Sequence, residues 1–473
     1  MLPKRTPRTA APARRHFKSL VIGAGYTGLA AARRLAELQP QDQVLVVDAT
    51  VAGEGSAGRN SGFLINLPHN TRMSGHHSPL EVARKQIAML QSGLDWLAQL
   101  SGQGGFDCGW DLAGKYHAAA TADGEQSLRG ALQQYGQWGV AYSELDRDAL
   151  QAQLGTRYYR FGYHSMNNVF VQPAALIRGL ADSLPENVWL TEDNPVLSID
   201  GSGPYKVRTR GGEFTADNVI LANNAFARRL GFLRSRLVTI FTYAGVTPVL
   251  SPAQQALLGE RDQWGVIPAN RLGTTLRRIS GGRFMVRSAY SYEAEQPLER
   301  MEQLLRDSFV RRYPDLAAHD FEYVWSGSTG LTGNGASFVG AIQPGLYASV
   351  GCNGAGVIKG TIYGKLLGEQ VAGHRSAMLD DLASFEKPNW LPPEPLRRIG
   401  ALSTIAYQAR KAGSPRQLQP SGACPRGDRH PGRDRLPPPP KRFKTASCPR
   451  CGRAAGAAGG ASPGRLAPAP PAT

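Results

Sequence analysis

The chain has no run of about 18 or more apolar residues, so we expect no membrane-spanning helix. It also has few cysteines: there are five in 473 residues, and only Cys108 and Cys352 lie before residue 413. Two cysteines so far apart do not form a disulfide framework, and they favour a reducing, cytoplasmic compartment. No apolar stretch precedes the first expected strand, so we do not expect a secretory signal.

Acidic residues are scarce at both ends of the chain. Residues 1–18 contain six Lys or Arg and no acid, and residues 411–473 contain twelve Lys or Arg and two acids. These flanks carry 16 of the net +17 charges, which leaves the middle close to neutral and argues against a core that binds nucleic acid. We expect a disordered basic leader over residues 1–16, with a transit-type leader as the alternative.

The last stretch, residues 413–473, lacks Val, Ile, Trp and Tyr and is rich in Pro, Arg, Gly and Ala. Such a segment cannot bury enough apolar surface to fold, so we expect it to be disordered. Cys448 and Cys451 have the spacing of half a zinc site, but only Cys424 and His430 lie near them, and we expect no metal site. The abrupt change in composition also fits an aberrant or frame-shifted end, which resequencing of the coding DNA would test.

A glycine-rich turn is the most informative motif. Gly23, Gly25 and Gly28 have G-x-G-x-x-G spacing between an apolar strand and an Ala/Leu-rich helix. The glycines allow a tight turn, close approach of a pyrophosphate and close helix packing, and the helix N-terminus favours an anion. Asp48 ends the next apolar strand, where an acid binds a ribose hydroxyl. The motif predicts a dinucleotide site and leaves FAD and NAD open.

The remaining periodicities predict two kinds of architecture. Helical patterns cover residues 79–101, 146–154, 172–181 and 297–312, and residues 188–221 and 236–292 are rich in strand signals. We predict an α/β fold with an α+β insertion: a Rossmann-like dinucleotide domain and an antiparallel-sheet substrate domain. The expected boundaries are 17–80, 146–232 and 325–412 for the first domain, 81–145 for a helical or mixed segment, and 233–324 for the substrate domain.

Two further glycine loops bear on the choice of cofactor. One covers residues 53–63, and the other covers residues 349–360 and opens a second helix. A second glycine-rich helix N-terminus is more than NAD needs, and it suits the longer body of a flavin. The alternative is that these two loops are unrelated turns that do not share a ligand.

With these motifs the chain resembles the FAD-dependent amine and amino-acid oxidoreductases, the superfamily of D-amino-acid oxidase, glycine oxidase and sarcosine oxidase. The nearest branch is the γ-glutamylputrescine-oxidase-like one. The resemblance covers residues 17–412 and is specific to the superfamily, not to a substrate. It rests on the first glycine turn and on residues 56–62, 193–197, 219–225, 273–277, 325–340 and 351–360.

The resemblance implies a set of FAD-binding residues. The ADP half would be held by Gly23, Gly25, Thr27, Gly28 and Asp48. The pyrophosphate and flavin ring would be lined by Ser56, Arg59, Asn60, Ser61 and Gly62, and Val196 would meet the adenine through its backbone. The pyrimidine end of the flavin would be held by Gly351, Asn353, Gly354, Gly356 and Val357.

The chain departs from the sarcosine oxidases at three places. Residues 324–329 lack the cysteine that bonds the flavin there, so we expect non-covalent FAD and interpret Cys352 as a small buried residue. Ala355 replaces a histidine of the last loop, and Lys359 is one place from the carboxylate-binding lysine. These departures do not favour a sarcosine-like substrate.

The resemblance implies oxidation of an amine or amino acid to an imine, with electrons passed to oxygen or a quinone. Tyr243, Arg277, Arg287 and Tyr290 are candidates for substrate contact because they lie in strands of the expected substrate domain, although packing or solvent exposure would also account for them. No catalytic residue is assigned. His69, His76 and His77 are interpreted as loop residues, not metal ligands.

Two other functions stay open at this point. The chain could be a flavin-binding subunit of a larger complex without substrate chemistry of its own, or an NAD(P)-linked dehydrogenase. Flavin reduction by an amine alone would exclude the first, and a bound flavin would exclude the second.

Overall fold

A mainly parallel sheet carries the first glycine turn. The computed structural model describes residues 2–68, 78–270 and 272–412. The spatial order of the main strands is β17-β18-β11-β1-β2-β8, with β18, β11, β1, β2 and β8 parallel. The strands are β17 (Phe338–Gln343), β18 (Leu346–Val350), β11 (Gly212–Leu221), β1 (His16–Ile22), β2 (Val44–Val47) and β8 (Val188–Thr191), with β10 (Tyr205–Thr209) and β9 (Val196–Asp200) continuing antiparallel from β11.

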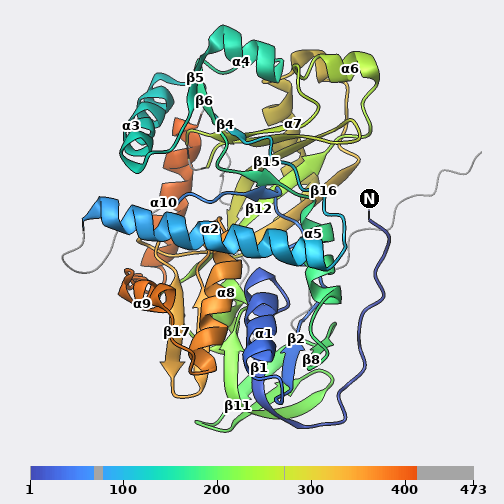
Figure 1. The fold of residues 1–473 in the computed structure, drawn as a ribbon. Helices are drawn as coiled ribbons and strands as arrows, with labels where there is room; N and C mark the ends of the chain where they lie inside the picture. Colours follow the sequence, from blue (N-terminus) through green and yellow to red (C-terminus); the bar gives the residue numbers. More distant parts are fainter. Residues whose placement is uncertain (1, 69–77, 271, 413–473) are drawn as a thin grey trace, which may run out of the picture. The chain divides into compact units, whose positions relative to one another are not determined.

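Four helices form a layer on one side of this sheet, two in contact with its strands and two packed against those helices. They are α1 (Tyr26–Leu38), α2 (Pro79–Gln103), α5 (Pro173–Asp182) and α8 (Ile358–Val371). Figure 1 shows α1 and α8 side by side, with α2 lying crosswise to both. Their apolar side chains form one core with Val21, Val46 and Ile220 of the strands. The opposite face buries Leu20 and Val219 in a second core.

The second sheet has the spatial order β16-β12-β15-β14-β13-β4-β6-β5 and is antiparallel except where β13 pairs with β4. Helix α7 (Leu298–Val310) packs on it. Its strands are β16 (Tyr323–Leu331), β12 (Val238–Val246), β15 (Arg283–Tyr292), β14 (Thr275–Ile279), β13 (Trp264–Pro268), β4 (Lys115–Ala119), β6 (Phe161–Ser165) and β5 (Ser143–Asp146). The sheet thus draws on a wider span than the expected 233–324, because β4, β5, β6 and most of β16 join it through strand pairing.

Short elements complete the described chain. The pair of β3 (Phe63–Leu64) and β7 (Val169–Phe170) forms a separate two-stranded ribbon. The other helices are α3 (Ala122–Trp138), α4 (Arg147–Leu154), α6 (Pro252–Ala256), α9 (Ala377–Ser384) and α10 (Leu396–Lys411), with 3₁₀ turns η1 (Asn224–Leu230) and η2 (Pro314–Leu316). No helix within the described ranges has the length and apolar character needed to cross a membrane.

The fold class predicted from the sequence is confirmed, and the expected helices appear as α2, α4, α5 and α7. The leader, which we expected to be disordered, is described from residue 2 and makes ion pairs with folded elements. The expectations for residues 413–473, including Cys424, His430, Cys448 and Cys451, lie outside the described residues. So do those for His69, His76 and His77.

Candidate cofactor and substrate site

The first glycine turn joins β1 to α1. Gly23 has φ +110°, and a Cβ there would lie 2.9 Å from the Ala222 carbonyl oxygen, so only glycine fits. A Cβ on Gly28 would lie 1.8 Å from the Gly23 carbonyl oxygen. Gly25 is the N-cap of α1 and provides no capping side chain. The first-turn N–H groups of α1 can therefore bind a phosphate.

Asp48 follows β2 beside this turn. Its Oδ2 accepts a hydrogen bond from Ala24 N at 2.6 Å, and its Oδ1 accepts from Thr50 N at 2.8 Å and Thr50 Oγ1 at 3.0 Å. Burial raises the pKa of this carboxyl, while these hydrogen bonds oppose the rise. The Asp48 carbonyl oxygen accepts from Asn194 N at 2.8 Å, which brings the start of β9 at Val196 close to the acid. The sequence-predicted ADP residues therefore lie together.

The loop over residues 56–62 connects the two sheets. Ser56 Oγ accepts a hydrogen bond from Ser328 N of β16 at 2.9 Å, and Trp325 Nε1 donates to the Arg59 carbonyl oxygen at 3.0 Å. Within the loop, Asn60 Oδ1 accepts from Gly62 N at 2.8 Å. These bonds set the loop between the dinucleotide turn and the second sheet, where the sequence analysis expected the pyrophosphate and flavin ring.

The second glycine loop is held from within the protein. Gly351 N donates to Asn224 Oδ1 at 2.9 Å. Asn353 has φ +53°, its Oδ1 accepts from Thr332 N at 2.9 Å, and its Nδ2 donates to the Gly351 carbonyl oxygen at 2.8 Å. The side chain of Asn353 is therefore used to hold the loop. Its backbone groups are the ones available to bind a ligand. A Cβ on Gly354 would meet no atom within 4 Å, so this position borders open space.

Helix α8 begins after this loop, and its N-cap Val357 makes no side-chain capping bond. The N–H groups at this helix N-terminus, from Val357 onward, therefore have no capping side chain from Val357 and face the loop. Two strand-following helices thus offer their N-termini at the same edge of one sheet. From the sequence, the second glycine loop was expected to open a helix, and it does.

Close packing of α1 against α8 brings these two helix ends together, and the sequence analysis missed it. A Cβ on Gly360 would lie 2.8 Å from Thr27 Oγ1, and one on Gly364 would lie 2.2 Å from the Thr27 carbonyl oxygen. A Cβ on Gly368 would lie 2.9 Å from the Ala31 carbonyl oxygen. The signal was present as glycine at every fourth position, which lines one helix face. Thr27 therefore lies in a helix contact as well as in the motif.

Arg277 of β14 ties the second sheet to the cofactor loop. Its NH1 donates to the Ser61 carbonyl oxygen at 2.9 Å and to the Val171 carbonyl oxygen at 2.7 Å. Its guanidinium carbon lies 4.7 Å from the Phe170 ring centre. Burial lowers the pKa of Arg277 to about 10. A Cβ on Gly62 would lie 2.0 Å from NH1, so glycine makes room for this guanidinium.

The other three substrate candidates lie in different surroundings. Tyr243 is fully buried against α7, and its hydroxyl bonds Ser291 Oγ at 2.8 Å and accepts from Gln296 N at 2.7 Å. Tyr290 packs with Ile405 of α10 and donates to the Gly273 carbonyl oxygen at 3.1 Å. Arg287 stays half-buried, with its guanidinium carbon 5.3 Å from the Tyr290 ring centre. Both tyrosine hydroxyls are therefore engaged by the protein.

Lys115 is a buried cation that the sequence analysis did not single out. Lys115 precedes Tyr116 of β4, and Tyr116 pairs with Val266 of β13, so Lys115 is level with Gly265. Gly265 in turn pairs with Arg277 of β14. The pleat therefore places Lys115 and Arg277 on one face of the sheet. Lys115 Nζ donates to Ser165 Oγ at 2.9 Å and to the Asn167 carbonyl oxygen at 3.3 Å.

Burial of the charged amine lowers the pKa of Lys115 to about 7. No sequence signal marked this lysine, because its burial follows from the pairing of β4 with β6 and β13.

These residues fit FAD. Two uncapped helix N-termini suit its pyrophosphate and the anionic form of its ring, and Asp48 suits a ribose. Within the described part of the chain, Asn223 Oδ1 is buried beside the first glycine turn and has no hydrogen-bond partner. A polar ligand at this edge of the sheet would satisfy it.

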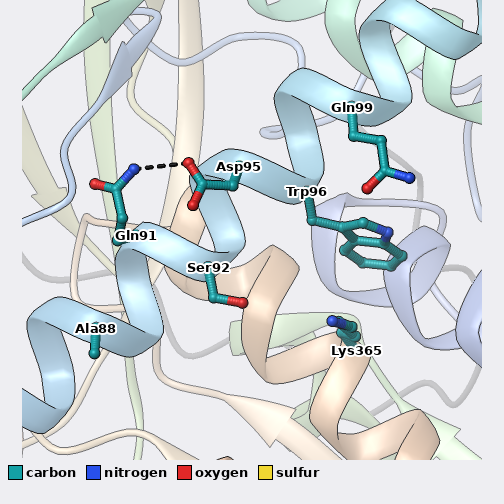
Figure 2. A pocket seen from close by; sticks show the side chains of 7 residues that line it. All are labelled: Ala88, Gln91, Ser92, Asp95, Trp96, Gln99 and Lys365. Carbon is teal, nitrogen blue, oxygen red and sulfur yellow. Dashed lines mark hydrogen bonds between the residues drawn. The ribbon is translucent and has the colours of Figure 1, made fainter.

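A groove of about 470 Å³ lies elsewhere, between α2 and α8. Figure 2 shows Gln91 and Asp95 of α2 joined by a hydrogen bond of 2.7 Å, and Trp96 facing Lys365 of α8. Lys365 Nζ lies 5.3 Å from the Trp96 ring centre. None of the sequence-predicted site residues lines this groove, and the glycine loops stay the candidate cofactor site.

Comparison with known proteins identifies the family. A probable oxidoreductase OrdL of Rhizobium meliloti is 26% identical over 397 residues, covering 82% of this chain and 90% of that protein. γ-Glutamylputrescine oxidoreductase of Escherichia coli is 26% identical over 361 residues, covering 75% and 83%. Glycine oxidase from Geobacillus kaustophilus superposes with a TM-score of 0.65 at 19% identity, covering 77% of this chain and 96% of the other.

These likenesses confirm the resemblance that the motifs indicated, and the structural one shows the shared fold. The sequence profile of the DAO family, described as FAD dependent oxidoreductase, matches residues 18–370. This match covers well over half of the chain, and the chain therefore belongs to the DAO family of FAD-dependent oxidoreductases.

Proposed function

We propose that this oxidoreductase oxidises the C–N bond of an amine or amino acid to an imine and passes the electrons to oxygen or a quinone. The observation that carries the proposal is the position of Arg277, a buried guanidinium on the second sheet that contacts the cofactor loop at Ser61. The names of two similar proteins, γ-glutamylputrescine oxidoreductase and glycine oxidase, also refer to amine-containing compounds.

When bound, FAD would supply the two-electron acceptor for this reaction. The N–H groups at Gly25 and Val357 would bind anionic parts of the cofactor, and Asp48 would accept hydrogen bonds from the ribose. Arg287 and Arg277 give the second sheet a positive charge near the cofactor loop. This charge favours a substrate that carries an anionic group as well as an amine.

We infer that FAD is held without a covalent bond. Residues 324–329 of β16 contain no cysteine. Cys352 Sγ lies 3.3 Å from Thr329 Oγ1 and 3.2 Å from Asn224 Nδ2, so its neighbours are polar groups of the protein. Acid precipitation of the purified protein should release all of its flavin into the supernatant. Flavin that stays with the pellet would contradict this inference.

An anaerobic screen of flavin bleaching tests the reaction. Polyamines, N-methyl amines, and D- and L-amino acids are added separately, and the loss of visible flavin absorbance is followed. We expect at least one of these classes to reduce the flavin, and readmission of oxygen or of a soluble quinone then identifies the acceptor. Arg287→Met should weaken reduction by the active compound, whereas Arg208→Met, at an exposed position of β10, should not.

The alternative of a flavin-binding subunit predicts a different outcome. Such a protein would bind FAD and show no bleaching with any amine in the screen. That result would overturn the amine-oxidation proposal and leave membership of the family intact. The family membership itself favours FAD over NAD(P) as the cofactor.

A further inference from the structure

The N-terminal leader runs along the edge of the parallel sheet. β8 is the last strand of the main order, and Glu192 directly after it donates its N–H to the Arg8 carbonyl oxygen at 2.8 Å. Trp189 Nε1 donates to the Ala10 carbonyl oxygen at 3.3 Å. The leader therefore covers β8 although residues 2–15 form no helix or strand.

Glu192 is the centre of this contact. Its side chain is fully buried, and its Oε2 accepts from Arg8 N at 2.8 Å. Its Oε1 accepts from Ala52 N at 2.9 Å and lies 3.4 Å from Arg5 Nε. A buried carboxylate is destabilising unless it is paired and hydrogen-bonded. The leader supplies one of the two hydrogen bonds to Glu192 and the ion pair from Arg5, and the turn after Asp48 supplies the other hydrogen bond.

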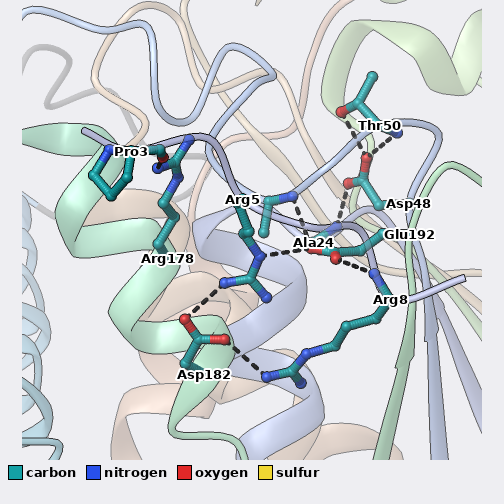
Figure 3. Close-up of polar contacts among 10 residues, drawn as sticks. Pro3, Arg5, Arg8, Ala24, Asp48, Thr50, Arg178, Asp182 and Glu192 are labelled. Carbon is teal, nitrogen blue, oxygen red and sulfur yellow. Dashed lines mark hydrogen bonds and ion pairs between the residues drawn. The ribbon is translucent and has the colours of Figure 1, made fainter. Parts of the chain in front are cut away.

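Helix α5 provides a second connection. Arg178 NH1 donates to the Pro3 carbonyl oxygen at 2.7 Å, and a Cβ on Gly53 would lie 3.1 Å from Arg178 Cγ. Asp182 forms ion pairs with Arg5 at 2.7 Å and Arg8 at 2.8 Å. Figure 3 shows these side chains of the leader and α5 gathered beside Glu192.

The turn held in this way carries the ribose-binding acid. Thr50 donates twice to Asp48 Oδ1, and Ala52 N donates to Glu192. Figure 3 shows Thr50 and Ala24 both bonded to Asp48, with Glu192 close by. A shift of Glu192 would therefore move the backbone that orients Asp48.

We propose that residues 2–10 form a strap that is a working part of the FAD site. The strap holds Glu192 and Arg178, these two residues hold the turn at residues 50–53, and the turn orients Asp48 for the adenosine ribose. Arg5, Arg8 and Glu192 are positioning residues in this scheme. The proposal rests on FAD binding, which the family implies, and not on the identity of the substrate.

The test measures cofactor affinity. Apoprotein is titrated with FAD and, separately, with ADP, for the full chain, for a chain lacking residues 2–10, and for Arg5→Ala. We expect both strap variants to bind FAD at least about tenfold more weakly, because a buried charge loses its partner. ADP affinity should fall by the same factor, because the strap acts on the adenosine half. Arg14→Ala, an exposed leader residue, is the matched control and should bind like the full chain.

Two further measurements separate positioning from general destabilisation. A synthetic peptide of residues 2–15 should restore FAD affinity to the shortened chain, and the melting temperature of each apoprotein should change less than that of its FAD complex. Unchanged FAD affinity in both strap variants, or weaker FAD binding with unchanged ADP binding, would overturn the proposal. No readout uses amine oxidation, so a failed substrate screen leaves this result interpretable.

Discussion

Individual residues show where local sequence was enough to predict the site. Gly23 and Gly28 could be predicted because their restriction is steric and local: one needs a positive φ and the other needs a missing Cβ. Asp48 could be predicted from its place at a strand end. Lys115 could not, because nothing in its neighbourhood along the chain indicates that three strands will bury it.

Asp48 leads to a prediction about cofactor affinity. Asp48→Asn keeps a carbonyl oxygen that can accept from Ala24 N, but it removes the charge that strengthens hydrogen bonds to ribose hydroxyls. We expect FAD to bind the apoprotein about tenfold more weakly, as measured by quenching of flavin fluorescence. Asp148→Asn, on the exposed start of α4, is the control and should bind FAD normally.

Lys115 leads to a prediction about stability and pH. Its pKa is about 7 in the folded protein and about 10.4 in an unfolded chain. Between these values the unfolded chain binds one more proton, so this residue makes the free energy of unfolding rise with pH from about 7 to about 10. Below about pH 7 both states are protonated, and the destabilisation by the buried charge is fully present.

Lys115→Met removes this titration. The gain in the free energy of unfolding of the variant over the wild type should be greatest near pH 6. This gain should shrink by up to about 4 kcal/mol toward pH 10. Urea unfolding of both proteins at several pH values measures this gain. In the variant, Ser165 and Asn167 lose their hydrogen-bond donor, which lowers the free energy of unfolding by an amount that does not depend on pH. Parallel pH profiles for the two proteins would contradict the lowered pKa.

Among the helices and strands, too, some could be predicted from local sequence and others could not. α2, α4, α5 and α7 could be predicted because each has an amphipathic pattern and a start signal such as Ser78 or Pro173. β4 and β6 were not assigned to the second sheet, because the link to it is the pairing of β4 with the distant β13, and no alternation in sequence marks that partner. The contact between α1 and α8 depends on the same long-range arrangement.

Gly364 allows the helix contact to be tested. Gly364→Ala would place a methyl group 2.2 Å from the Thr27 carbonyl oxygen, so the helices must separate. We expect a loss of about 2 kcal/mol in the free energy of unfolding and weaker FAD binding, because the two helix N-termini would move apart. Gly130→Ala in α3 is the matched control: its methyl group would meet no atom within 4 Å, and alanine should stabilise that helix.

At the scale of the whole molecule, the site depends on contacts between the two sheets. Ser56 and Arg59 bond to β16, and Ser61 bonds to Arg277 of β14. Arg277 was expected to contact the substrate, and that role stays a prediction. Its bonds to Ser61 and Val171 could not be foreseen, because they join segments more than 100 residues apart.

Arg277 tests this coupling between the sheets. Arg277→Lys keeps the charge but has no planar guanidinium to bond both carbonyl oxygens and stack on Phe170. We expect FAD affinity to fall about tenfold and protease cleavage within residues 53–62 to become faster. Arg208→Lys, at an exposed position of β10, should change neither. Normal FAD affinity in Arg277→Lys would show that the loop does not need this connection.

The strand order of the first sheet has a consequence for biosynthesis. The G-x-G-x-x-G turn leaves the ribosome well before β18 and α8, which end at Val371. A nascent chain that stops before β18 has the complete motif and Asp48, yet it lacks the second helix N-terminus and the glycines that pack against α1. FAD should therefore load only after nearly the whole described chain has been synthesised, and a truncated product ending at about residue 345 should be colourless.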